Sequence, residues 1–231
     1  MGDTAPAVVT LHVWQVPPRT LPVALARMAV DPHRVRRLSG LRFAKLLGTG
    51  TGTTFGVRDA DPTRWALLAS WDDAGAADSF DDSTVVRGWD AQAVERLRVR
   101  LRPLASRGAW SRRQPFGDPQ AQPHAGSVAA LTRARIAPRK LATFWRSVPP
   151  VAADLHAQAG VRLAFGIGEA PVGWQGTFSV WESAAAMNNF AHHRAAHAAA
   201  IRRTDEERWY AEELFARFAV LDAEGSYRGR T

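Results

Sequence analysis

Residues 11–21, LHVWQVPPRTL, decide the fold, because a related stretch, LTRARIAPRKL, recurs at residues 131–141. Each stretch reads as a strand that ends at a proline, a residue that the interior of a sheet rarely accepts. The separation is 120 positions, and GLRFAKLLG at residues 40–48 recurs as GVRLAFGIG at residues 160–168 with the same separation. Ordered matches at one separation indicate an internal duplication.

Later parts of the two copies match at nearby separations. Ser70-Trp71 followed by Phe80 corresponds to Val180-Trp181 followed by Phe190, at 110 positions for the tryptophans, and Leu104 and Gly108 correspond to Leu221 and Gly225, at 117 positions. The first copy predicts a strand, a helix, two strands, a helix and a strand at residues 8–16, 21–37, 41–47, 65–71, 74–94 and 99–104, with a helix break near 81–84. The second copy predicts the same order at residues 128–136, 141–158, 161–167, 175–181, 183–214 (interrupted) and 215–221.

This order is that of a ferredoxin-like βαββαβ unit. Two such units side by side predict an α+β fold, a pseudo-dimeric α/β barrel with its helices outside. We expect repeat 1 at residues 8–110, a linker at 111–126 and repeat 2, which would carry the ligand, at 127–227. The linker has proline- and glutamine-rich composition, as linkers often do.

Composition excludes several classes. The chain has 231 residues, of which 46% are hydrophobic and 23% charged, an ordinary globular balance. It has no cysteine, which excludes disulfides, thiolate nucleophiles and sulfur ligands. The sequence has no apolar stretch long enough for stable membrane insertion and no secretory signal at its start, so we expect a cytoplasmic protein. The net charge of +8 comes from scattered arginines, and the pattern does not favour nucleic-acid binding.

The copies differ in two places, and function on a duplicated scaffold tends to lie where the copies differ. The interval from Gly48 to Trp71 is ten residues longer than its counterpart and contains the glycine-rich run at residues 48–54. That run lacks the lysine and helix start of a phosphate-binding loop, so we interpret it as a hairpin tip or lid. The interval from Phe190 to Leu221 is seven residues longer than its counterpart, about two helical turns.

The second insertion is rich in histidine. On a helix, Phe190, His193, His197 and Ile201 would share one stripe, while His192 would point away. Two histidines on an apolar stripe can be metal ligands, core residues or surface residues, and the spacing alone leaves these open. Zinc is less favoured because it usually needs a third protein ligand. Small alanines around these histidines would let a flat ligand approach the backbone.

Other catalytic chemistry is sparse. No pair of carboxylates is placed for acid–base work, and Ser179 lacks the glycines of a nucleophile elbow. Aromatic residues concentrate in the second half, where some could line a large apolar pocket: Phe144, Trp145, Phe165, Phe178, Trp181, Phe190, Trp209 and Phe218.

Several motifs resemble those of the spheroidene monooxygenase family, which oxidises acyclic carotenoids. They are FAKLLGTGTG at residues 43–52, RGAW at 107–110, GIGEAPV at 166–172, TFSVW at 177–181, WYAEELFARF at 209–218, and His197 with the following AIR at 200–202. The resemblance covers nearly the whole chain, residues 11–227.

The resemblance implies heme b, with iron held by one axial histidine. His197 falls on the family's matching histidine and is the first choice as metal ligand, with His193 second. Similar fused barrels include heme-dependent aldoxime dehydratases. We therefore expect a heme-dependent monooxygenase acting on an apolar or secondary-metabolite substrate, with dioxygen or peroxide and an electron donor. The alternatives are a heme enzyme of N–O bond dehydration or rearrangement and a non-catalytic heme-binding barrel.

The predicted site has two groups of residues. The cofactor-binding group is His197, His193, Phe190, Ile201, Phe178 and Trp181. The candidate catalytic group is Arg217, Arg162 and Ser179. Arg133, Arg162 and Arg217 lie on second-half strands and could pair with heme propionates or polarise bound oxygen, or serve as surface or structural charges.

Overall fold

The structure is a computed structural model that describes residues 4–50, 59–120, 122–136, 158–169, 174–193 and 210–230. The strands are β1 (Val8–Gln15), β2 (Leu41–Gly50), β3 (Ala60–Trp71), β4 (Glu95–Gly108), β5 (Val128–Ile136), β6 (Val161–Gly168), β7 (Trp174–Trp181) and β8 (Tyr210–Gly225). The helices among the described residues are η1 (Pro18–Thr20), α1 (Leu21–Val35), α2 (Ala74–Asp81), α3 (Thr84–Asp90) and α6 (Ala184–His193).

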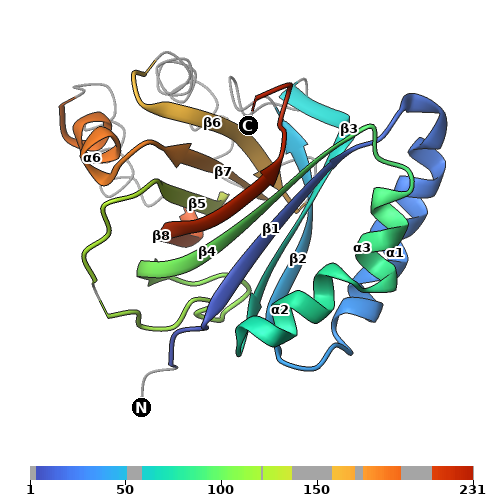
Figure 1. Cartoon of the computed structure of the whole chain (residues 1–231), viewed down its shortest axis with the longest axis horizontal. Helices are drawn as coiled ribbons and strands as arrows, with labels where there is room; N and C mark the ends of the chain where they lie inside the picture. The colour runs from blue at the N-terminus through green and yellow to red at the C-terminus, as the bar shows by residue number, and fades with distance from the viewer. Residues whose placement is uncertain are drawn as a thin grey trace.

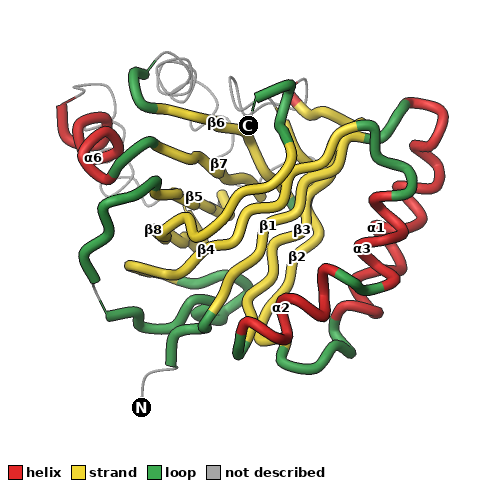
Figure 2. The backbone as a smooth tube through the Cα atoms, viewed as in Figure 1, coloured by secondary structure: helices red, strands yellow, loops and turns green. Residues whose placement is uncertain are grey.

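The strands close into an antiparallel barrel in the order β1-β3-β2-β6-β7-β5-β8-β4 (Figures 1 and 2). Each half contributes four neighbouring strands, and the halves meet at two seams, β2 with β6 and β4 with β8. Helices α1, α2 and α3 lie outside the first-half sheet, and α6 lies outside the second-half sheet (Figure 1). The pseudo-dimeric α+β barrel predicted by the repeat is confirmed.

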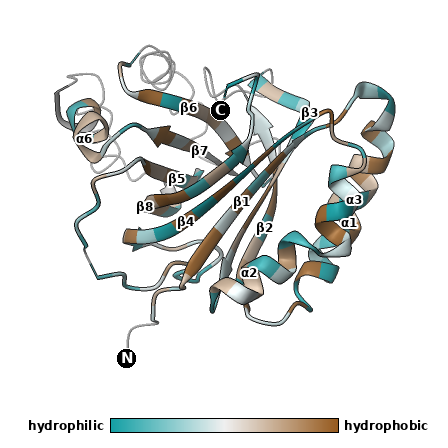
Figure 3. Ribbon diagram, viewed as in Figure 1, coloured by the Kyte–Doolittle hydropathy of each residue, from teal (hydrophilic) through white to brown (hydrophobic). Residues whose placement is uncertain are grey.

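Strand β1 illustrates why both faces of the sheet are apolar. Val9, Leu11 and Val13 point into the barrel core, while Val8 and Trp14 pack beneath the helices outside. A strand that is buried on both faces reads as a nearly continuous apolar run. Figure 3 shows brown, hydrophobic stretches along the strands.

The expected helix break is present. Asp73 caps the N-terminus of α2, and Ser83 caps that of α3 by accepting from the backbone N–H of Val86. The predicted end of the last helix is wrong, because residues 210–214 belong to β8. The pairing with β4 and β5 and the burial of Leu214 in the barrel core favour the strand there.

Equivalent turns close the two ends of the barrel. After β4, Gly108 takes a positive φ of 94°, and Trp110 pairs with Arg113 through backbone hydrogen bonds. After β8, Gly225 takes a φ of 91°, and Tyr227 pairs with Arg230 in the same way. The turns lie at opposite ends because β4 and β8 are antiparallel. We call them the Trp110 plug (Gly108–Arg113) and the Tyr227 plug (Gly225–Arg230).

Each plug is held by a glutamate from the other half. Glu212 accepts from the backbone N–H groups of Ser111 at 3.1 Å and Arg112 at 2.8 Å. Glu95 accepts from the backbone N–H of Gly229 at 2.7 Å. Burial alone would raise the pKa of Glu95, but hydrogen bonds from the backbone of Gly229 and Arg228 and from the side chains of Arg64 and Ser226 outweigh burial and lower its pKa to about 2.

Buried side chains from all eight strands and both plugs form one core inside the barrel. Phe116 from the linker joins this core and meets Phe218 edge to face. Because described side chains fill the interior of the barrel, its outer faces are the candidate places for a ligand. None of the helices in the part of the chain that the structure describes is long and apolar enough to cross a membrane.

Candidate functional site

The strand register allows the outer faces of the two halves to be compared row by row. Across β1, β3 and β2 one outward row has bulky side chains: His12, Leu67 and Leu46. Across β5, β7 and β6 the equivalent row has small ones: Thr132, Thr177 and Gly166. The outer wall of the second half is therefore much thinner at this row.

The neighbouring row differs in the same direction. In the first half Trp14 is 1% exposed, and it stacks on Trp89 of α3 with 5.3 Å between ring centroids. Its indole N–H donates to Asp90 at 2.7 Å. The second half has Ala134 at the equivalent position, which removes a large aromatic side chain from the space above the sheet.

The difference in side-chain volume between the halves is local. At the other end of the strands, Trp71 of β3 and Trp181 of β7 are both large and buried. Trp181 packs against Phe190 of α6 with 5.4 Å between ring centroids, and its indole N–H donates to Ser179 at 2.9 Å. Trp181, Phe190 and Ser179 thus border the face of small residues on its apolar side.

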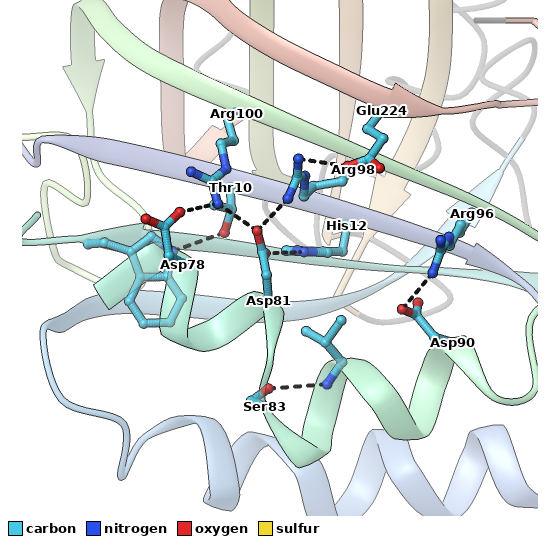
Figure 4. Close-up of polar contacts among 12 residues, drawn as sticks. Thr10, His12, Asp78, Asp81, Ser83, Asp90, Arg96, Arg98, Arg100 and Glu224 are labelled. Atoms are coloured by element: carbon cyan, nitrogen blue, oxygen red, sulfur yellow. Dashed lines mark hydrogen bonds and ion pairs between the residues drawn. The ribbon is translucent and has the colours of Figure 1, made fainter. Parts of the chain in front are cut away.

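Charge differs between the halves as well as volume. In the first half, Arg100 of β4 pairs with Asp78 at 2.5 Å and Asp81 at 2.7 Å, both on α2 (Figure 4). In the second half, the equivalent Arg217 of β8 meets the amide oxygen of Asn188 at 3.3 Å. Ala191 stands where the first half has Asp81. Among the described residues, no carboxylate compensates the charge of Arg217.

In the first-half cluster, Asp81 is paired with several basic side chains. Asp81 accepts from His12 at 2.9 Å and from Arg98 at 2.6 Å in addition to Arg100 (Figure 4). Burial alone would raise the pKa of Asp81, but the hydrogen bonds from His12 and the two arginines hold this pKa far below its ordinary value. Carboxylates of α2, together with Asp222 and Glu224 of β8, therefore compensate Arg98 and Arg100, whereas the described residues give Arg217 only the amide of Asn188 as a partner.

Three predicted residues lie apart from this face. Phe178 is fully buried inside the barrel against Phe165, on the side of the sheet opposite to Ser179. Arg162 is exposed at the bulge between Val161 and Leu163. Arg133 is also buried, and it pairs with the carboxylates of two glutamates, Glu169 and Glu212, so its charge is already compensated.

The predicted axial ligands lie at the border of the described region. His193 is the last residue of α6, and its side chain is not among those described. His197 and Ile201 lie outside the described residues. Within the ranges that the structure describes, no three histidine or acidic side chains gather as a metal site.

Sequence reasoning missed the small residues that form the face and the amide that replaces an acid: Thr132, Thr177, Gly166, Ala134 and Asn188. The repeat held the signal, because each of these positions has a bulky or acidic counterpart at the separations already found. The sequence alone does not show that these positions share one face, which the strand register does.

No family model matches the chain. Two curated relatives are both called spheroidene monooxygenase. The one from Rhodobacter capsulatus is 38% identical over 91% of this chain and 88% of its own length. The one from Rubrivivax gelatinosus is 42% identical over 83% of this chain and 73% of its own length.

Among solved structures, an aldoxime dehydratase in complex with butyraldoxime matches with a TM-score of 0.63. The match covers 97% of this chain and 85% of the dehydratase at 11% identity. This similarity shows a shared fold. The high identity and mutual coverage with the curated relatives show more: the chain belongs to the spheroidene monooxygenase family, whose members are oxidoreductases.

Proposed function

We propose that the protein is a heme-dependent monooxygenase that transfers one oxygen atom to a carotenoid, with heme b held against the outer face of the second-half sheet. Family membership supports the reaction class and an apolar polyene as substrate. The observation that carries the location is the contrast between the halves. Bulk is missing in the row of Thr132, Thr177 and Gly166, and acidic charge is missing at Arg217, two positions along β8 from the residue opposite Thr132.

The described residues fit the group. A porphyrin is flat and mostly apolar, and its two propionates are anionic. The row of Thr132, Thr177 and Gly166 offers a low surface for the ring, and Arg217 offers a planar donor for a carboxylate. We propose that His197 would hold the iron, with His193 as the second choice, because the motif resemblance described above places His197 at the family's histidine.

The bound heme would supply the activation of dioxygen or peroxide, which no side chain of this protein can provide. Arg217 would fix an anionic group at the edge of the site. Trp181, Phe190 and Met187 would form a dry apolar wall against which a polyene chain can lie. Ser179 Oγ accepts the indole N–H of Trp181, which leaves its own proton available to a ligand. With dioxygen, an external electron donor is needed to reduce the second oxygen atom to water.

The two alternatives have less support. Dehydration of an N–O bond rests on a fold likeness at 11% identity, whereas the curated monooxygenases are 38% and 42% identical. A non-catalytic heme-binding barrel is less favoured for the same reason.

The absorption spectrum tests the cofactor. Protein from cells supplied with a heme precursor should show a Soret band, and His197→Ala should lose it while His193→Ala retains it. His33→Ala is the matched control, because His33 is exposed on α1. A wild-type protein without a Soret band, even after titration with hemin, would exclude heme.

A second measurement tests the reaction. The heme-loaded protein is given an acyclic carotenoid in detergent with a reductant under labelled dioxygen. The expected product carries one labelled oxygen atom, and its absence with a range of reductants and with peroxide would contradict the monooxygenase assignment.

A further inference from the structure

The outward face of α1 is unusually apolar for a surface helix. Five large apolar side chains are exposed in the described part of the chain, and three of them lie on this helix. These are Val23 at 47%, Leu25 at 58% and Val30 at 45% exposure. Pro22, Ala26 and Ala29 are exposed beside them. Figure 1 shows α1 at the periphery of the molecule, on the outside of the first half.

This outward face is not needed for packing. The inward side of α1 already fills the first-half core through Leu21, Ala24, Met28 and Val35. On the flank, the guanidinium of Arg27 lies over Gly88 of α3, where a β-carbon would collide with it. The apolar residues on the outside of α1 therefore contribute little to folding.

The exposed charged side chains between positions 18 and 37 all have one sign. Arg19 precedes the helix, and Arg34, Arg36 and Arg37 lie at its end, all with exposed side chains. Asp31 is the one acidic residue between positions 18 and 37, and it is 0% exposed, paired with Arg27 at 3.4 Å and Arg34 at 3.1 Å. The outward surface of this segment is thus apolar at its centre and cationic at both ends.

We propose that α1 adsorbs to the surface of a bilayer that contains anionic lipids, lying in the plane of the interface. Exposed apolar residues can enter the boundary between headgroups and acyl chains, and the flanking arginines can pair with anionic headgroups. A second copy of the chain fits less well, because a two-fold contact through α1 would bring the arginines of both copies together. The occupant with complementary charge and an apolar layer is the lipid surface.

This inference goes beyond the proposed function and is independent of the cofactor, because it rests on α1 alone. It complements that function, since a long polyene dissolves in membranes and not in water. Adsorption would concentrate the enzyme where such a substrate is found.

Vesicle flotation of the full-length protein tests the proposal. The wild type should float with phosphatidylcholine vesicles that contain phosphatidylglycerol, remain at the bottom with pure phosphatidylcholine, and be released by high salt. The double variant Val23→Asp with Leu25→Asp should reduce binding at least tenfold, and Arg36→Glu with Arg37→Glu should abolish the salt-sensitive component.

Leu221→Asp is the matched control, because Leu221 is 51% exposed on β8, away from α1, and this variant should float like the wild type. Thermal melting of each variant confirms that it is folded. Failure of the wild type to float with anionic vesicles, or wild-type flotation of the folded Val23/Leu25 variant, would overturn the proposal. Dimerisation that this variant abolishes, without flotation, would assign the face to a second copy instead. Flotation requires neither heme nor activity, so its outcome is separate from that of the proposed function.

Discussion

The two halves of the barrel share one backbone plan and differ on their outer faces. In the first half, Trp14, Leu67 and Leu46 cover the outer face of the sheet, and Asp81 pairs with the basic side chains beside it. The second half replaces this bulk with small residues and meets Arg217 with the amide of Asn188. At matching positions, one copy has bulky and acidic side chains and the other has small side chains and an amide. Paired differences of this kind are expected where one copy of a duplicated scaffold has specialised for a ligand.

The largest expected effect is on the stability of the first half. Trp14→Ala should lower the free energy of unfolding by about 3–5 kcal/mol, because a buried indole and its hydrogen bond to Asp90 are both lost. Urea denaturation measures the loss, with Val94→Ala at an exposed position as control. Heme loading of the folded fraction should be unchanged. A Trp14→Ala protein that stays stable but loses heme would reverse the roles assigned to the halves.

The next effect is on ligand binding in the second half. Thr177→Leu places on the small face the residue that the first half has at the equivalent position, Leu67. An overpacking cost of about 1–3 kcal/mol should weaken hemin binding roughly five- to 150-fold, measured by hemin titration. The reciprocal Leu67→Thr should lower stability and leave hemin affinity unchanged. Equal hemin affinity in Thr177→Leu and the wild type would contradict heme binding at this face.

A smaller effect should follow from restoring the missing acid. Asn188→Asp would give Arg217 the carboxylate that Arg100 has in Asp78, and hemin affinity should fall several-fold, by about 1 kcal/mol or less. Added salt should shrink the difference. The control is Asp78→Asn in the first half, which should not change hemin affinity. An Asn188→Asp protein with tighter hemin binding would contradict the role given to Arg217.

The last effect concerns the plugs, and at neutral pH it does not show as a pH dependence of stability. The pKa of Glu95 is lowered to about 2 in the folded protein, below its ordinary value of 4.5. Its contribution to stability is therefore complete above pH 5 and is lost as the pH falls from about 5 towards 2. Glu95→Gln should flatten the pH dependence of the urea midpoint in that window. An unchanged slope would mean that other carboxylates determine the acid sensitivity.

The element order and the barrel were predictable because the same local sequence patterns occur in both copies. Those patterns determine the strands and the first-half helices. The repeat matched the glycines that begin the two plugs, Gly108 and Gly225, but the contacts of the plugs were not predictable. Trp110 and Tyr227 lie in short turns without periodicity, and their partners are far away in sequence: Ser111 and Glu212 are 101 positions apart. Long-range pairing of this kind leaves no signal in a single sequence.

Of the predicted site residues, Trp181, Phe190, Ser179 and Arg217 lie beside the small face, and their roles in a site stay predictions. Phe178 was harder to place, because a strand that is apolar on both faces does not reveal which face a side chain takes. The histidine assignments stay predictions.

The two plugs also describe how the halves are joined. The Trp110 plug follows the last strand of the first half but is held by Glu212 of the second, and the Tyr227 plug follows the second half but is held by Glu95 of the first. These reciprocal hydrogen bonds join the two halves independently of the peptide that connects them. A protein nicked after Gln120 should remain one particle, and the two fragments, made separately, should reassemble into the intact barrel.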